Sequence, residues 1–311
     1  MEMPTVGIPR SLLYHQYGVL WETFFQEVGI EWILSPPSNR ELLLLGTQAA
    51  VDESCLSSKL FLGHVAWLIG KCDYIFVPRI AGYPCGGTVC TKYMALCDLV
   101  RNTFREKRVK LAEWNVDPGN KDYEFSAFVS LGQSLGIPKT RCAKAYWNAR
   151  RAFRMYLFAE EEKLRCASEK NGMKILLVGH EYNLKDALFG KPISDYLSLQ
   201  GITLLDASAA NERDMLNLSE KISDLIPWYC NKILVGAVER YRSVADGIIL
   251  MSAFPCGPDS LVNEIIKSRV KDVPILNLII DGQDATVGLE TRLESFIDIL
   301  SMKKAQEKGF A

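Results

Sequence analysis

The sequence of 311 residues lacks several patterns that would assign a function at once. Nowhere do 18 apolar residues follow one another without interruption, so the sequence offers no transmembrane helix. It contains no Gly-x-x-x-x-Gly-Lys-Ser/Thr segment and no Gly-x-Gly-x-x-Gly segment after a strand, the two common phosphate-binding loops. We therefore expect that the chain does not hydrolyse ATP itself.

An excess of charge of one sign is also missing. The chain has 36 Lys and Arg against 37 Asp and Glu, and its formal net charge is −1. The electrostatic footprint of a nucleic-acid-binding protein is therefore not indicated. The first residues do not form a basic segment followed by an apolar core, which is the pattern of a secretory signal. These absences predict a cytoplasmic protein that binds neither nucleic acid nor membrane.

Histidine is scarce, whereas cysteine is plentiful: three histidines accompany nine cysteines. No Cys-x-x-Cys pair and no His-x-x-x-His spacing occurs, so a structural zinc site would need widely separated ligands. In a chain without a signal peptide, this many cysteines indicate thiol or metal chemistry before disulfides.

Apolar stretches of strand length alternate with amphipathic stretches of helix length. We expect strands at residues 5–8, 31–34, 73–80, 174–178, 202–205, 247–253 and 274–280. We expect helices at residues 12–28, 40–51, 56–70, 91–105, 139–170, 228–242, 261–270 and 291–304. Short apolar strands that alternate with helices are typical of parallel sheets covered on both faces. The predicted fold class is α/β, with two doubly wound parallel-sheet domains.

The two halves of the sequence resemble each other. Each opens strand, helix, strand, and each later has an Asp-x-Ile strand that leads into a cysteine-containing loop and a helix. After a charged, irregular stretch to about residue 121, a helical block joins the halves. We expect an N-terminal domain over 1–137, a helical connector over 138–171 and a C-terminal domain over 172–311. Ligands bind at the carboxyl ends of such strands, so the expected site is the interdomain cleft.

Three cysteines stand where a predicted helix is about to start: Cys55, Cys90 and Cys256. The clearest is Cys256, which lies in Phe-Pro-Cys-Gly-Pro-Asp-Ser between an apolar strand and an amphipathic helix. The positive end of a helix lowers the pKa of a cysteine and favours the thiolate, the form that ligates metals. A fourth thiol, Cys85, lies in a glycine-rich loop.

Family resemblance is carried by six segments spread over nearly the whole chain: residues 7–14, 51–64, 73–79, 90–93, 256–260 and 291–296. In this order they resemble the 2-hydroxyacyl-CoA dehydratase and benzoyl-CoA reductase superfamily, and within it the activase-related branch. The resemblance implies a [4Fe-4S] cluster bound by Cys55, Cys90 and Cys256. It also implies a separate ATP-dependent iron–sulfur activator protein as electron donor, and an acyl-CoA or other small molecule as electron acceptor.

Thiolates from distant loops suit an iron–sulfur cube, whose irons spread the ligand positions more widely than a single zinc ion does. Three ligands leave one iron open to water, sulfide or a substrate oxygen. The alternative is that these cysteines only pack as small apolar residues. Some members of the superfamily carry a double-cubane cluster. Cys85 is an alternative ligand, an extra ligand for such a larger cluster, or a loop thiol without a role in binding. The remaining cysteines are expected to pack or to face solvent: Cys72, Cys97, Cys142, Cys166 and Cys230.

Arg10 and Arg79 each follow a proline at the end of a predicted strand. Their guanidinium groups could stabilise an anionic cluster or hold a thioester or carboxylate, or could instead form a structural ion pair or clamp a carbonyl. Glu53 and His64 are further candidates for acid/base work or hydrogen bonding to a cluster, as are two nearby lysines, Lys59 and Lys92.

Three classes of function remain open on the sequence. The chain is an enzyme component of anaerobic metabolism that reduces or dehydrates a small activated substrate at the open iron. Alternatively, it is an electron-transfer or cluster-carrier protein with no substrate of its own, or a metal-free module that binds a small molecule. A paralogous subunit or a second copy of the chain is a further expected partner.

Overall fold

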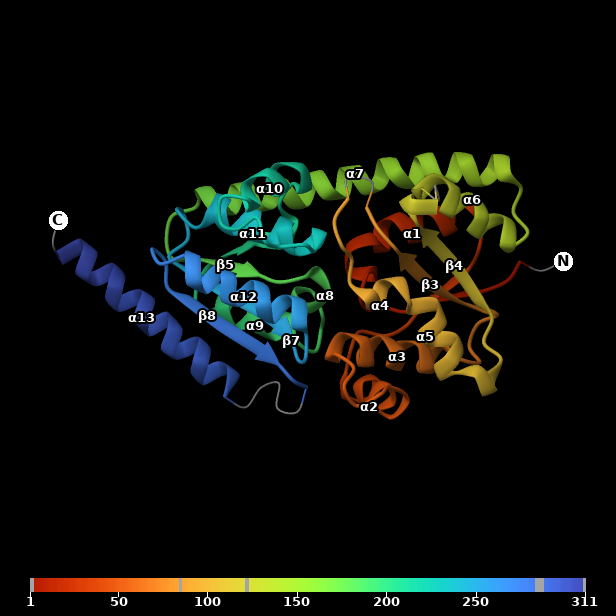
Figure 1. Ribbon diagram of the computed structural model, residues 1–311, viewed down its shortest axis with the longest axis horizontal. Helices are drawn as coiled ribbons and strands as arrows, with labels where there is room; N and C mark the ends of the chain where they lie inside the picture. Colours follow the sequence, from red (N-terminus) through yellow and green to blue (C-terminus); the bar gives the residue numbers. More distant parts are fainter. Residues whose placement is uncertain (1–2, 84–85, 121–122, 283–287, 310–311) are drawn as a thin grey trace. The chain divides into compact units, whose positions relative to one another are not determined.

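The computed structural model describes residues 3–83, 86–120, 123–282 and 288–309 (Figure 1). The chain divides into two compact units. The first contains the residues up to Ala159 together with Pro227–Tyr229, and the second contains Glu160–Ile226 and the residues from Cys230 onward. Each unit has a four-stranded parallel sheet, which confirms the predicted α/β fold class with two doubly wound sheets.

The sheet of the first unit has the strand order β2-β1-β3-β4, and all of its neighbouring strands are parallel. Its strands are β1 (Val6–Ile8), β2 (Trp32–Leu34), β3 (Tyr74–Ile80) and β4 (Leu111–Val116). Strands β1, β2 and β3 confirm the strands predicted at residues 5–8, 31–34 and 73–80. The expectation of an irregular stretch over this part of the chain was wrong for β4. In this strand buried Ala112, Trp114 and Val116 alternate with more exposed residues, and flanking charges mask that pattern.

The helices of the first unit are α1 (Tyr14–Val28), α2 (Arg40–Ala49), α3 (Leu56–Leu68), α4 (Thr91–Met94), α5 (Leu96–Thr103), α6 (Glu124–Ser134) and the first two thirds of α7 (Lys139–Glu169). The single helix predicted over 91–105 is broken at Ala95, whose backbone leaves the helical region (φ −102°, ψ 10°). The carbonyl of Met94, just before the break, accepts a hydrogen bond from the side chain of Arg79.

Aromatic side chains form the core of the first unit. Trp21 lies 4.7 Å from Phe76 and 5.5 Å from Trp114, measured between ring centroids, in edge-on arrangements that the ring quadrupoles favour. Phe24 packs on Phe128 of α6 at 4.6 Å. Because these rings come from α1, β3, β4 and α6, the core joins the sheet to the helices that cover it.

The sheet of the second unit has the order β6-β5-β7-β8, again with parallel neighbours. Its strands are β5 (Lys174–Val178), β6 (Thr203–Asp206), β7 (Gly247–Ala253) and β8 (Ile275–Ile280). All seven residues of β7 are buried, as expected of a central parallel strand. Its helices are α8 (Glu181–Leu184), α9 (Gly190–Leu199), α10 (Glu212–Ser219), α11 (Tyr229–Tyr241), α12 (Gly257–Arg269) and α13 (Leu289–Gly309).

A short segment from late in the chain belongs to the first unit. Thr88 pairs with Trp228 in an isolated parallel bridge, and the ring of Tyr83 stacks on that of Tyr229 with centroids 4.0 Å apart. This segment therefore packs on the loop that precedes Cys90. None of the described helices combines the length and the apolar character that crossing a bilayer requires.

Candidate functional site

The three cysteines singled out in the sequence occupy equivalent positions in the fold. Cys55, Cys90 and Cys256 are the N-cap residues of α3, α4 and α12, and all three have extended backbone conformations. All three side chains are half-buried. Each thiol therefore stands next to backbone N–H groups that have no partner within the helix.

The start of α12 is surrounded by buried polar groups of the second unit. The carboxylate of Asp259 accepts hydrogen bonds from Nε2 of His180, at 3.0 Å, and from Nδ2 of Asn231, at 2.9 Å. Burial raises the pKa of Asp259, but the nearby His180 imidazole and hydrogen bonds from His180, Asn231 and Cys256 hold it below its usual range. The thiol of Cys256 therefore lies beside an ionised carboxylate that two other elements hold in place.

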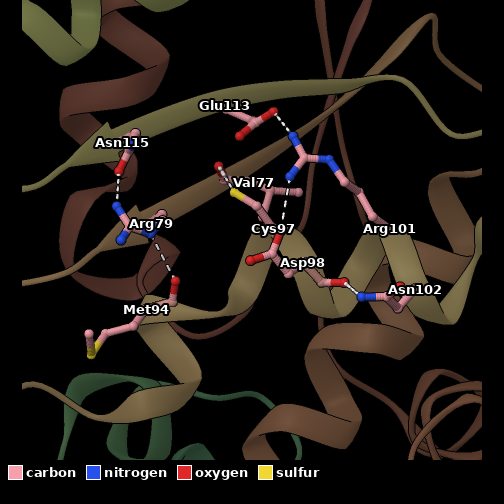
Figure 2. A network of polar contacts seen from close by, with 9 residues as sticks. All are labelled: Val77, Arg79, Met94, Cys97, Asp98, Arg101, Asn102, Glu113 and Asn115. Carbon is pink, nitrogen blue, oxygen red and sulfur yellow. Dashed lines mark hydrogen bonds and ion pairs between the residues drawn. The ribbon is translucent and has the colours of Figure 1, made fainter.

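The turn of helix that Cys90 begins is tied to the sheet by Arg79 (Figure 2). Nε of Arg79 donates to the carbonyl oxygen of Met94 at 2.9 Å, and Nη1 donates to Oδ1 of Asn115 at 2.5 Å. Both terminal nitrogens lie 3.3 Å from Oδ2 of Asp117. Arg79 thus makes both the ion pair and the carbonyl contact that the sequence left as alternatives, and its catalytic role stays a prediction.

Arg10 and His64 lie near each other at the carboxyl ends of β1 and β2. The backbone N–H of Arg10 donates to Oγ of Ser35 at 2.7 Å. The same hydroxyl lies 2.7 Å from Nδ1 of His64, and Oγ of Ser38 lies 3.1 Å from Nε2. Burial, with smaller effects from His15 and Arg10, lowers the pKa of His64 to about 3. His64 is therefore neutral near pH 7, which restricts the acid/base role predicted for it to the neutral imidazole.

The weaker candidates lie close to the cysteine loops in the sequence. Glu53 is exposed in the turn that precedes Cys55, and Lys59 is half-buried in α3. Lys92 is half-buried in α4. Their proposed roles stay predictions. Cys85 lies outside the described residues.

The other described cysteines are placed as expected for packing or surface residues. Cys97 and Cys142 are buried, and desolvation raises the pKa of both thiols, to about 12 for Cys97. Cys72 is half-buried, donates to the carbonyl of Leu68, and also has a pKa raised by burial. Cys166 is exposed on α7, and Cys230 is half-buried in α11. A raised pKa disfavours the thiolate, so Cys97, Cys142 and Cys72 are poor metal ligands.

Residues expected at the site belong to different parts of the fold. Cys55, Cys90, Arg10 and Arg79 lie in the first unit and Cys256 lies in the second. Within the described part of the chain, no group of three or more His, Cys, Asp or Glu side chains is arranged to hold a metal ion. The three N-cap thiols do fit an iron–sulfur cluster in donor chemistry, because such clusters are held by thiolates.

Sequence reasoning missed His180, Asn231 and Asp259. Asp259 is part of the quoted Cys-Gly-Pro-Asp-Ser segment, and His180 follows the predicted strand 174–178 after one glycine. Ligands bind where strands end and helices start in such folds, so these positions could have marked both residues as candidates. The pairing itself joins residues 79 positions apart and has no local pattern.

Comparison with known protein families identifies the family of this chain. Residues 5–209 match the family described as the CoA enzyme activase uncharacterised domain (DUF2229), and the chain belongs to this family. The matched segment contains Cys55, Cys90, Arg10 and Arg79, whereas Cys256 lies beyond it. The activase-related resemblance seen in the sequence is thereby confirmed.

Two further comparisons are less informative. No curated protein matches the sequence. Among solved structures, the SBP FpvC from Pseudomonas aeruginosa, in complex with Mn²⁺, is similar at 12% identity with a TM-score of 0.31. The alignment covers 97% of this chain and 100% of that one, but so low a TM-score supports no conclusion about function.

Proposed function

We propose that the chain is an iron–sulfur component of a CoA-enzyme activase system, with a [4Fe-4S] cluster ligated by Cys55, Cys90 and Cys256 and one iron left open. Membership of the family described as the CoA enzyme activase uncharacterised domain supports a role in such a system. The observation that carries the cluster is the shared position of the three thiols: each is a half-buried N-cap with extended backbone. That the three meet on one cluster is part of the proposal.

The contrast with the other thiols supports this choice of ligands. Burial raises the pKa of Cys72, Cys97 and Cys142, so their sulfurs are expected to stay protonated at neutral pH. Cys55, Cys90 and Cys256 instead stand at the N-caps of helices. The chain therefore separates potential ligands from packing cysteines by where they lie.

A bound cluster would supply low-potential electron transfer and, at its open iron, a position for a small ligand such as the carbonyl oxygen of an acyl-CoA. The residues of the chain would bind and orient it: the loops before α3, α4 and α12 present the thiols. The sequence contains neither common phosphate-binding loop, so a separate ATP-dependent iron–sulfur activator protein is the proposed electron donor.

Metal analysis of anaerobically prepared protein tests the proposal. We expect a brown protein with about four irons and four sulfides per chain. Replacing Cys55, Cys90 or Cys256 by Ala should remove most of the iron. The matched control is Cys166→Ala, because Cys166 is exposed on α7 and should not bind the cluster. The assignment would be overturned by a colourless wild type, by bound zinc, or by equal iron in all four variants. About eight irons per chain would indicate a double cubane in place of a single one.

A redox titration followed by absorbance and electron paramagnetic resonance tests the electron transfer. The activator with ATP should reduce the protein, whereas mild donors alone should not. ATP turnover by this chain alone would contradict the partner model. A reproducible change of the spectrum on adding an acyl-CoA would identify an enzyme component, and its absence would favour an electron carrier.

A further inference from the structure

We propose that Arg79 is a positioning residue for Cys90, which it holds in place through the backbone of α4. The importance of Cys90 as a ligand rests on the proposed function, but the mechanical link between the two residues does not. Arg79 would act on the site without touching a cluster or a substrate.

The link is a chain of two hydrogen bonds through the backbone of one residue, Met94. Nε–H of Arg79 donates to the carbonyl oxygen of Met94 at 2.9 Å (Figure 2). The backbone N–H of Met94 in turn donates to the carbonyl oxygen of Cys90 at 3.4 Å, and that of Tyr93 donates to the same oxygen at 2.9 Å. The carbonyl of Cys90 is therefore one helical turn away from the guanidinium.

At its other end Arg79 is anchored in the sheet. It lies in β3 directly beside Asn115 of β4 in the parallel register, and its Nη1 donates to the Asn115 side chain at 2.5 Å. Asp117, just beyond β4, accepts from both terminal nitrogens at 3.3 Å, and its side chain is 13% exposed. The guanidinium donates to Met94, Asn115 and Asp117 at once from a fixed planar fork, which a lysine ammonium cannot reproduce.

Helix α4 needs such an anchor because of its length. Its four residues, Thr91–Met94, form a single turn, and helix formation is unfavourable until several turns have formed. The loop before it contains Gly86 and Gly87 with φ of +82° and +95°, a backbone region that glycine adopts most readily. A cation that donates to the last carbonyl of a helix stabilises its C-terminus.

The charge of Arg79 is already balanced by Asp117. Arg79→Gln removes the link to α4 and also leaves the carboxylate of Asp117 without its cation, whereas Arg79→Lys keeps the charge and loses the planar fork. Comparison of the two variants distinguishes a positioning role from the direct cluster contact that the sequence suggested. The structure offers a matched control in Arg101 of α5, which lies in the same region and bonds the side chains of Asp98 and Glu113 instead of a backbone carbonyl (Figure 2).

The experiment compares Arg79→Gln, Arg79→Lys and Arg101→Gln with wild type, using the full chain without metal under anaerobic conditions. Millisecond hydrogen exchange reports on the amides of Tyr93 and Met94, and alkylation of Cys90 by iodoacetamide at fixed pH is followed by peptide mass spectrometry. In Arg79→Gln we expect exchange and alkylation to be about tenfold faster, the effect of one lost charge-assisted hydrogen bond. Arg79→Lys should be intermediate, and Arg101→Gln should equal wild type.

A second readout uses the reconstituted protein. Iron should be lost to a chelator several-fold faster in Arg79→Gln than in Arg101→Gln. Equal exchange and equal alkylation in these two variants would overturn the positioning role, as would unchanged α4 exchange together with a shifted midpoint potential. If the wild type binds no iron, the proposed function fails, whereas exchange and alkylation still decide the role of Arg79. Circular dichroism checks that each variant is folded.

Discussion

Nε2 of His180 lies 3.0 Å from Oδ1 of Asp259, a carboxylate whose side chain is only 6% exposed. The imidazole comes from the end of β5 and the carboxylate from the first turn of α12. Asn231 of α11 donates to the same oxygen. Three elements of the second unit are thus joined at one carboxylate, three residues after Cys256.

Asp259→Ala should destabilise the second unit by about 2–4 kcal/mol, because it leaves the amide of Asn231 and the ring of His180 without their acceptor. Urea unfolding followed by circular dichroism measures this loss. The control is Ser260→Ala at the neighbouring exposed position, where Oγ of Ser260 donates to the Cys256 carbonyl; it should cost less than about 1 kcal/mol. Equal losses in the two variants would contradict the anchoring role.

The first unit should lose stability in acid because of His64. Its pKa in the folded protein is about 3, below the ordinary value of 6.5, so the unfolded chain binds a proton first as the pH falls. The contribution of neutral His64 to the free energy of unfolding is fully present above pH 6.5. As the pH falls toward 3, on the order of 4 kcal/mol of it is lost. His64→Gln should flatten this dependence between pH 7 and 4.

Tryptophan fluorescence can follow this unfolding selectively. The six tryptophans are Trp21, Trp32, Trp67, Trp114, Trp147 and Trp228, and all belong to the first unit. The same slope with pH in His64→Gln and wild type would show that His64 does not cause the acid sensitivity.

The second unit should show the opposite dependence because of Glu181. Burial raises the pKa of this carboxyl to about 7, and nearby Asp206 and Glu160 add to the effect against the favourable Lys185. Its contribution to stability is present below pH 4.5 and is lost as the pH rises through 7, by on the order of 3 kcal/mol. Glu181→Gln should therefore be less sensitive to pH between 5 and 8 in circular dichroism, while the exposed Glu264→Gln should behave as wild type.

Gly63→Ala should destabilise the first unit by at least about 2 kcal/mol, because the added Cβ would overlap the carbonyl oxygen of Leu42 in α2. Helix α3 would have to move away from α2, and it is the helix that Cys55 begins. Tryptophan fluorescence during urea unfolding measures the loss. Gly82→Ala is the control, since its new Cβ would have its nearest neighbour 3.8 Å away, at Pro118; a loss as large there would refute the packing argument.

Strands and helices with a strong local pattern were predictable. Seven of the eight strands follow from apolar runs, and β7 is the clearest because a central parallel strand is apolar throughout. The eighth, β4, was not, because its alternation of Ala112, Trp114 and Val116 with polar residues lies among charged neighbours. The break at Ala95 was also hidden, since Met94 interacts there with a side chain 15 residues earlier.

For the candidate site, the sequence by itself determined which thiols stand at helix starts, because a turn or loop and the start of a helix are encoded within a few residues of Cys55, Cys90 and Cys256. Only the tertiary structure decided what surrounds them. The carboxylate beside Cys256 is held by His180 from another strand end, and the helix of Cys90 is held by Arg79 from the sheet. Such contacts join residues that are distant in the sequence, so they exist only once the strands have paired and brought their ends to one edge of a sheet.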